Sequence, residues 1–122
     1  MIDEIELMKK IDEYNYIDLR VYSISCECFG DEVTIFHEGA RWTFVSCLRV
    51  IFDHYWGNCC KDKPMRYLSM AQIPFFILDM NVKIENMYDI EVYSFDIHLS
   101  PLKMKIVCKD LLINGFSVND YK

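Results

Sequence analysis

The sequence predicts an α+β domain: a mainly antiparallel, twisted sheet of about six strands with an N-terminal amphipathic helix packed on one face. Two patterns lead to this prediction. Apolar residues recur with helical spacing near the N-terminus, whereas from residue 19 onward short runs alternate apolar and polar residues, as strands do. The chain has 122 residues, of which 52% are hydrophobic, so we expect one domain over residues 1–122 with a packed core.

Residues 2–14 are expected to form the helix. Acidic residues fill its first turn and Lys9 and Lys10 follow, which is the order that a helix dipole favours. Its apolar stripe consists of Ile2, Ile5, Met8 and Ile11, extended by Leu7 and Tyr14.

The next two strands are expected within residues 19–29 and 32–37, joined as a hairpin by a short Gly-Asp turn. Residues 41–55 follow as a central strand, because apolar residues occupy both of its sides. A helix over 45–56 is the alternative, but β-branched and aromatic residues dominate this stretch and favour the strand.

The second half of the chain begins with a polar loop at 57–64 and an ambiguous stretch at 65–78, and then alternates again. Four more short strands are expected, at 81–85, 90–99, 103–108 and 111–118. The residues that we expect to be largely buried are Ile5, Met8, Val33, Ile35, Phe44, Leu48, Val50, Ile97, Ile106 and Cys108.

The six cysteines are expected to be free thiols. The acidic first residues lack the basic start and apolar run of a secretory signal, so we expect a cytoplasmic protein, where disulfides are rare. Cys26 and Cys28 are spaced too closely for a structural zinc site, and adjacent Cys59 and Cys60 near His54 point in different directions. We therefore expect neither a disulfide nor a bound metal.

No catalytic or cofactor motif stands out in the sequence. A small cysteine-dependent enzyme would need Cys59 or Cys60 as the nucleophile and His54 as the base, but no third orienting residue or oxyanion loop is evident. The four glycines are isolated, so no phosphate-binding loop is present. We expect no enzymatic activity and no cofactor.

The charge of the chain argues for a basic protein partner. Its 19 acidic and 13 basic residues give a net charge of −6, whereas nucleic acids and anionic membranes select basic surfaces. Residues 1–38 hold ten acids against three bases and residues 79–96 hold five against one, while residues 101–109 hold three lysines and no acid.

Residues 79–96 are the expected contact surface, because their carboxylates are interleaved with tyrosines, which are common at protein interfaces. The alternative is a solvated hairpin without a binding role. The expected partner-binding residues are Asp79, Glu85, Tyr88, Asp89, Glu91, Tyr93 and Asp96.

The order of these segments resembles small bacterial immunity proteins that neutralise polymorphic or contact-dependent toxins. The resemblance spans most of the chain and rests on a short N-terminal helix followed by Val21–Ser25, Gly30–Ile35, the tryptophan-bearing Arg41–Phe44, Val92–Asp96 and Leu102–Ile106. It implies an acidic, cytosolic protein without enzymatic activity. No functional residue can be carried over from the family by motif.

The resemblance leads to the hypothesis of an immunity protein that binds a basic toxin domain, a nuclease, and occludes its active site. An adaptor, or a phage- or host-encoded inhibitor with another protein target, is the alternative that the sequence leaves open.

Overall fold

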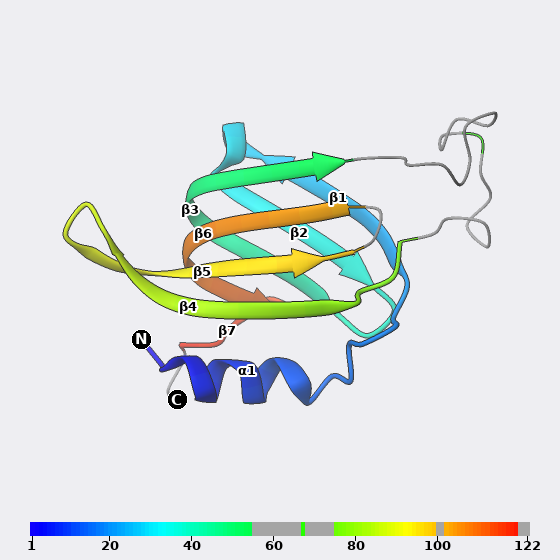
Figure 1. Cartoon of the computed structure of the whole chain (residues 1–122), viewed down its shortest axis with the longest axis horizontal. Coiled ribbons are helices and arrows are strands. Elements are labelled where there is room, and N and C mark those ends of the chain that lie inside the picture. Colours follow the sequence, from blue (N-terminus) through cyan, green and yellow to red (C-terminus); the bar gives the residue numbers. More distant parts are fainter. Residues whose placement is uncertain (55–66, 68–74, 100–101, 120–122) are drawn as a thin grey trace.

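A computed structural model describes residues 1–54, 67, 75–99 and 102–119 (Figure 1). The elements in chain order are α1 (Glu4–Asp12), β1 (Val21–Glu27), η1 (Cys28–Gly30), β2 (Glu32–His37), β3 (Arg41–His54), β4 (Asp79–Met87), β5 (Ile90–His98), β6 (Leu102–Ile113) and β7 (Phe116–Ser117). All strand pairs are antiparallel, in the order β1-β2-β3-β6-β5-β4, and short β7 pairs with β6. The predicted α+β class, with one N-terminal helix and an open six-stranded sheet, is confirmed.

The sheet is strongly bent, so that its two halves form two layers. In Figure 1, β1 and β2 lie behind β6 and β5, and α1 runs below β4. The core fills the space between the layers, with Trp42, Phe44, Tyr93 and Phe95 all fully buried. Phe44 from one layer meets Phe95 from the other edge to face, with their ring centroids 4.9 Å apart.

A bulge in β3 accompanies this bend. Cys47 is opposite Cys108 and Arg49 is opposite Val107, so Leu48 is an extra residue without a partner on β6. Ser46, just before it, has a positive φ of 55°. Leu48 is 39% exposed, so the prediction that it is buried was wrong, because the bulge interrupts the strand's alternation.

The two edges of the sheet approach each other at one corner. The backbone N–H of Val21 donates to the carbonyl of Phe75 at 2.9 Å, and that of Ile77 donates to the carbonyl of Leu19 at 3.0 Å. The segment before β1 is therefore hydrogen-bonded to the segment before β4, although the rest of the sheet remains open.

Helix α1 closes the other side of the core. Asp3 caps it by accepting a hydrogen bond from the Glu6 N–H at 2.8 Å. Glu4 Oε1 accepts the Ile84 N–H of the edge strand β4 at 2.6 Å, which satisfies an otherwise free edge donor. Among the described residues, no helix is long and apolar enough to cross a membrane.

The buried stripe of the helix differs from the predicted one. Leu7 and Ile11, four residues apart, are fully buried, whereas Ile5 is 81% exposed and its predicted burial was wrong. A strict three-residue repeat moves steadily around a helix, because one turn takes 3.6 residues. The helix also ends at Asp12, earlier than predicted.

The structure has strands in the predicted regions, but some of the predicted strand boundaries were wrong. Residues 41–54 form a strand, as expected, and the alternative helix over 45–56 was wrong for the residues described. The predicted strands 103–108 and 111–118 are instead one long strand, Leu102–Ile113, followed by a turn and β7. Burial is confirmed for Val33, Ile35, Phe44, Ile97, Ile106 and Cys108, and is partial for Met8 and Val50.

Buried His37 holds the turn between β2 and β3. Its Nδ1 accepts the N–H groups of Gly39 at 3.1 Å and Ala40 at 3.3 Å, and its ring packs edge-on against Trp42 with the centroids 4.3 Å apart. Nδ1 can accept only if it carries no proton, so the turn requires a neutral imidazole. Burial lowers the pKa of His37 to about 4.

We expect acid to destabilise the protein through His37. Above pH 6.5 the imidazole is neutral in both the folded and the unfolded chain, but between pH 6.5 and about 4 only the unfolded chain takes up the proton. The free energy of unfolding should therefore fall by about 2 kcal/mol between pH 7 and pH 5, at roughly 1.4 kcal/mol per pH unit. Urea unfolding at both pH values measures this, with His37→Asn as the non-titrating control. Equal losses in the two proteins would contradict the assignment.

Candidate functional site

The β4–β5 hairpin carries all of the predicted partner-binding residues, and its far end projects beyond the sheet. Pairing of β5 with β6 begins at Tyr93, so the residues before it have β4 as their only strand partner. Tyr88 and Asp89 form the two-residue turn, with φ values of 53° and 64° that fit a type I′ hairpin turn. We call residues 85–92 the hairpin tip; it projects at the left of Figure 1.

The hairpin tip is acidic and is exposed around its turn, whereas Val92 at its base is buried. Tyr88 is 84% exposed at its end, and Asp89 and Glu91 are exposed beside it. Glu85 is half-buried. The tip contains these three carboxylates and no lysine or arginine. The charged side chains within residues 85–92 are therefore all negative.

The other predicted carboxylates lie on the outer face, by which we mean the side of β3, β6, β5 and β4 that points away from the core. Asp79 and Asp96 alternate along their strands with the buried residues Met80 and Ile97, which places them on this face. Glu85 shares the outer face, whereas Glu91 points to the opposite side.

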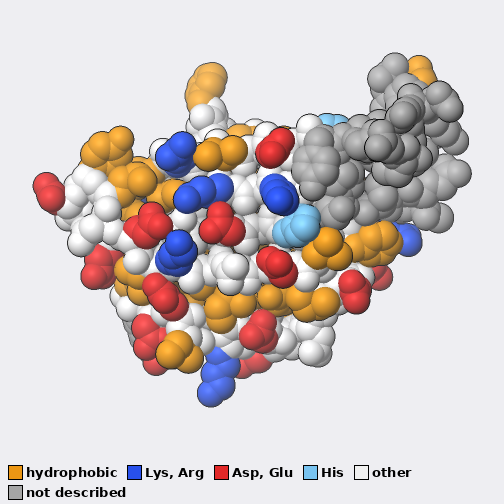
Figure 2. Space-filling model, viewed as in Figure 1, with side chains coloured by type: hydrophobic (Ala, Val, Ile, Leu, Met, Phe, Trp, Pro, Cys, Tyr) orange, Lys and Arg blue, Asp and Glu red, His pale blue; other side chains and the backbone are white. Residues whose placement is uncertain are grey.

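Basic residues interrupt the acidic strip on the outer face. Lys105 of β6 is directly opposite Asp96, and Lys103 stands between His98 of β5 and Asp53 of β3. Figure 2 shows acidic and basic side chains interleaved on this face. Because β6 brings the lysines of residues 101–109 beside the acids of residues 79–96, the outer face is mixed in charge and only the hairpin tip remains purely acidic.

The centre of the outer face is buried and largely apolar. Val92, Ser94 and Val107 are buried although they point away from the core. One row of opposing residues crosses all four strands here, namely Arg49, Val107, Ser94 and Lys83. Arg49 and Lys83 therefore lie at the two ends of a row whose two middle residues, Val107 and Ser94, are buried.

Tyr93 does not belong to the exposed surface, which corrects its place among the expected partner-binding residues. Its ring is fully buried. Its hydroxyl lies 2.8 Å from the carbonyl oxygen of Ile2 and 3.1 Å from Asn119 Oδ1, which in turn accepts the N–H of Ile2 at 2.8 Å. Tyr93 therefore joins the sheet to the two ends of the described chain.

The β1–β2 turn, which is η1, is a second projection that the sequence did not reveal. Cys28, Phe29 and Gly30 all have positive φ, at 52°, 58° and 100°. For the two residues that are not glycine this conformation costs about 1–2 kcal/mol each. Phe29 is nevertheless fully exposed. The prediction had placed residues 28 and 29 in a strand, and the only signal of a turn was the Gly-Asp pair that follows.

The β1–β2 turn rests on the bulge of β3. The N–H of Cys47 donates to the carbonyl of Asp31 at 3.0 Å. A hollow of about 380 Å³ lies between the turn and the bulge, and Phe29, Leu48 and Arg49 are among its lining residues. Two irregular backbone segments, far apart in the sequence, therefore build one local surface.

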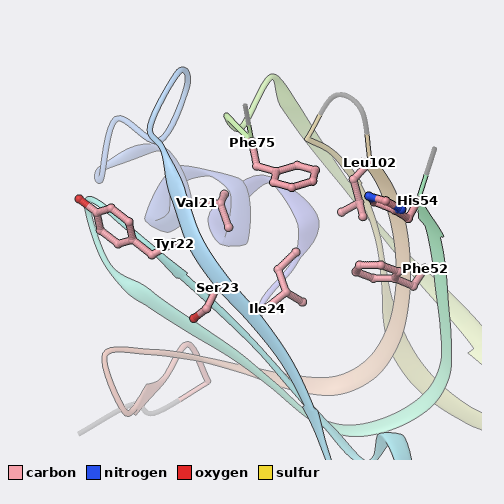
Figure 3. Close-up of a pocket in the computed structure, with 8 residues that line it drawn as sticks. All are labelled: Val21, Tyr22, Ser23, Ile24, Phe52, His54, Phe75 and Leu102. Atoms are coloured by element: carbon pink, nitrogen blue, oxygen red, sulfur yellow. The ribbon is translucent and has the colours of Figure 1, made fainter. Parts of the chain in front are cut away.

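An apolar cleft of about 410 Å³ lies at the other end of the sheet (Figure 3). Val21 and Ile24 of β1 line one side, and Phe52 and His54 at the end of β3 line the other. His54 is the proposed base of the cysteine-enzyme alternative, and its ring lies 6.2 Å from that of Phe75 between centroids. The proposed nucleophiles Cys59 and Cys60 lie outside the described residues.

The four described cysteines are free thiols. Cys26 and Cys28 are exposed, and Cys47 is opposite buried Cys108 across β3 and β6. A hydrogen bond with Cys47, together with burial, raises the pKa of Cys108, so this thiol stays protonated. No group of three metal-ligating side chains occurs in the part of the chain that the structure describes. Absence of metal from the whole protein stays a prediction, to be checked by elemental analysis.

We expect Tyr93→Phe to reduce the free energy of unfolding by about 1–2 kcal/mol, because it leaves the buried carbonyl of Ile2 without the donor of its hydrogen bond. Urea unfolding measures this loss. Tyr88→Phe removes the same hydroxyl from an exposed side chain and should leave stability unchanged. Equal stabilities of the two variants would show that the Tyr93 hydroxyl does not anchor the chain ends.

Comparison with known protein families gives a match over most of the chain. The family model described as "Immunity protein PIM7" matches residues 3–115, which is nearly the whole chain. No curated protein matches this chain. Immunity proteins neutralise a cognate toxin and are typically inhibitors rather than enzymes, so the cysteine-enzyme alternative has no support. The chain belongs to the PIM7 immunity protein family.

Proposed function

We propose that this protein neutralises its toxin by binding the toxin's catalytic domain in the cytoplasm and occluding the active site with the hairpin tip. One observation carries the proposal: the hairpin tip extends past Tyr93, where the pairing of β5 with β6 ends, and presents exposed Tyr88 among three carboxylates and no basic residue. Tyrosine is a common anchor of protein interfaces, and the surrounding charge selects a basic partner.

A nuclease is the toxin class that fits this surface best. An enzyme that cleaves nucleic acid gathers basic side chains around its active site to hold phosphates. Glu85, Asp89 and Glu91 would take the place of phosphate charges there, while Tyr88 supplies apolar contact. Asp79 and Asp96 would add peripheral contacts from the outer face, where neighbouring lysines reduce their influence.

Charge and aromatic contact should affect different rate constants. Long-range attraction between the net charge of −6 and a basic toxin raises the association rate, and salt weakens it because the screening length is about 8–10 Å at 0.1–0.15 M. A buried aromatic anchor instead slows dissociation, since its contacts form only after docking.

The first test uses the toxin domain recovered by pull-down from the native host, purified in a catalytically inactive form. We expect Glu85→Lys/Asp89→Lys to lower the association rate at least tenfold at low salt and to flatten its salt dependence. Asp12→Lys/Glu13→Lys makes the same change in net charge at the end of α1 and should have a smaller effect. Stopped-flow association measured over a series of salt concentrations gives both quantities.

Tyr88→Ala should raise the dissociation rate about tenfold or more with little change in association. The matching activity measurement uses the active toxin domain: one equivalent of wild-type protein should stop its cleavage of nucleic acid. Wild-type kinetics in both the charge-reversal and the Tyr88 variants would show that the hairpin tip is only a solvated hairpin. A bound toxin domain that does not act on nucleic acid would refute the nuclease assignment alone.

A further inference from the structure

Phe29 makes no contribution to the core that would explain its position. It is fully exposed, and it sits in the middle of three consecutive residues with positive φ. Asparagine and glycine adopt this conformation more readily than phenylalanine does. The turn is held by backbone hydrogen bonds, from the Asp31 N–H to the Cys28 carbonyl at 3.1 Å and from the Cys47 N–H to the Asp31 carbonyl at 3.0 Å. Folding therefore needs the turn and does not need the aromatic ring.

The surroundings of Phe29 combine apolar and acidic surface, although Arg49 also lines the hollow. Leu48 of the β3 bulge is exposed beside the hollow that Phe29 lines. Glu27 and Glu32 face each other directly across β1 and β2, and Asp31 lies between them in the sequence. A like-charge pair in direct register weakens a hairpin. A positively charged group on the partner would offset this repulsion. We therefore expect the partner surface that meets this turn to be basic.

The hollow beside the β1–β2 turn adjoins the same outer face that contains Lys83, two residues before the hairpin tip. The turn adjoins Arg49 at the hollow, and the row from Arg49 through Val107 and Ser94 to Lys83 crosses the outer face to β4. Three strand spacings separate β3 from β4, which is about 14 Å. A standard interface covers about 800 Å² on each partner, so one docked domain can span this distance.

We propose that Phe29 is a second anchor for the same toxin domain, inserting into an apolar pocket whose rim is basic and faces Glu27, Asp31 and Glu32. This inference rests on the proposed function in so far as the partner is the toxin domain. It assigns to the strained turn and the β3 bulge a role in binding that is separate from the hairpin tip.

The experiment compares Phe29→Ala with Phe116→Ala, because Phe116 is also a highly exposed phenylalanine but lies in β7. Both variants are measured against the inactive toxin domain by surface-immobilised kinetics. Phe29→Ala should raise the dissociation rate at least tenfold, and Phe116→Ala should leave it within twofold of the wild-type value. A dissociation rate of Phe29→Ala within twofold of wild type would overturn the proposal.

A second variant tests whether the residue serves binding rather than folding. Phe29→Asn should unfold at the same or a higher urea concentration than wild type and still dissociate at least tenfold faster. Unfolding at a clearly lower urea concentration would make Phe29 a structural residue and overturn the proposal. The hairpin-tip variants separate the two ideas: loss of binding there with a normal Phe29→Ala rejects only this inference, and the reverse result rejects only the hairpin tip.

Discussion

The pairing of β3 with β6 is the interaction on which the rest of the structure depends. These two long strands run opposite each other from Trp42 and Ile113 to His54 and Leu102. The first half of β3 carries β2 and β1, and β6 carries β5 and β4, so the two strands join both layers of the core. The bulge at Leu48 and the positive φ of Ser46 accompany the bend that lets the layers face each other.

The hairpin tip and the β1–β2 turn project because of where their strands stop pairing with β3 and β6. The hairpin tip projects because β4 and β5 continue past the last residue of β5 that pairs with β6. The β1–β2 turn is positioned because Asp31 is hydrogen-bonded to the bulge at Cys47. Both projections place an exposed aromatic residue, Tyr88 or Phe29, at a positive φ near carboxylates. Neither ring contributes to the core, which is why we propose a binding role for both.

The sequence predicted much of the fold, because alternation and helical spacing are local properties. It identified the helix, the strand at residue 41 and the sheet without long-range information. The predicted burial was wrong where it depends on tertiary structure. The bulge exposes Leu48, which was expected to be buried. Tyr93 was expected at the surface but points into the core toward Ile2. The sequence also could not show that β6 brings Lys105 opposite Asp96, because that contact depends on strand order. The turn at Phe29 lacked a recognisable turn sequence at its strained positions.

Hydrogen exchange of the complex tests most directly whether the hairpin tip is the surface that meets the toxin. We expect the amides of residues 85–92 to exchange more slowly when the inactive toxin domain is bound than in the free protein. The amides of α1, which runs below β4 in Figure 1, should exchange at the same rate in both states. Slower exchange confined to α1 and β7, with residues 85–92 unchanged, would contradict binding through the hairpin tip.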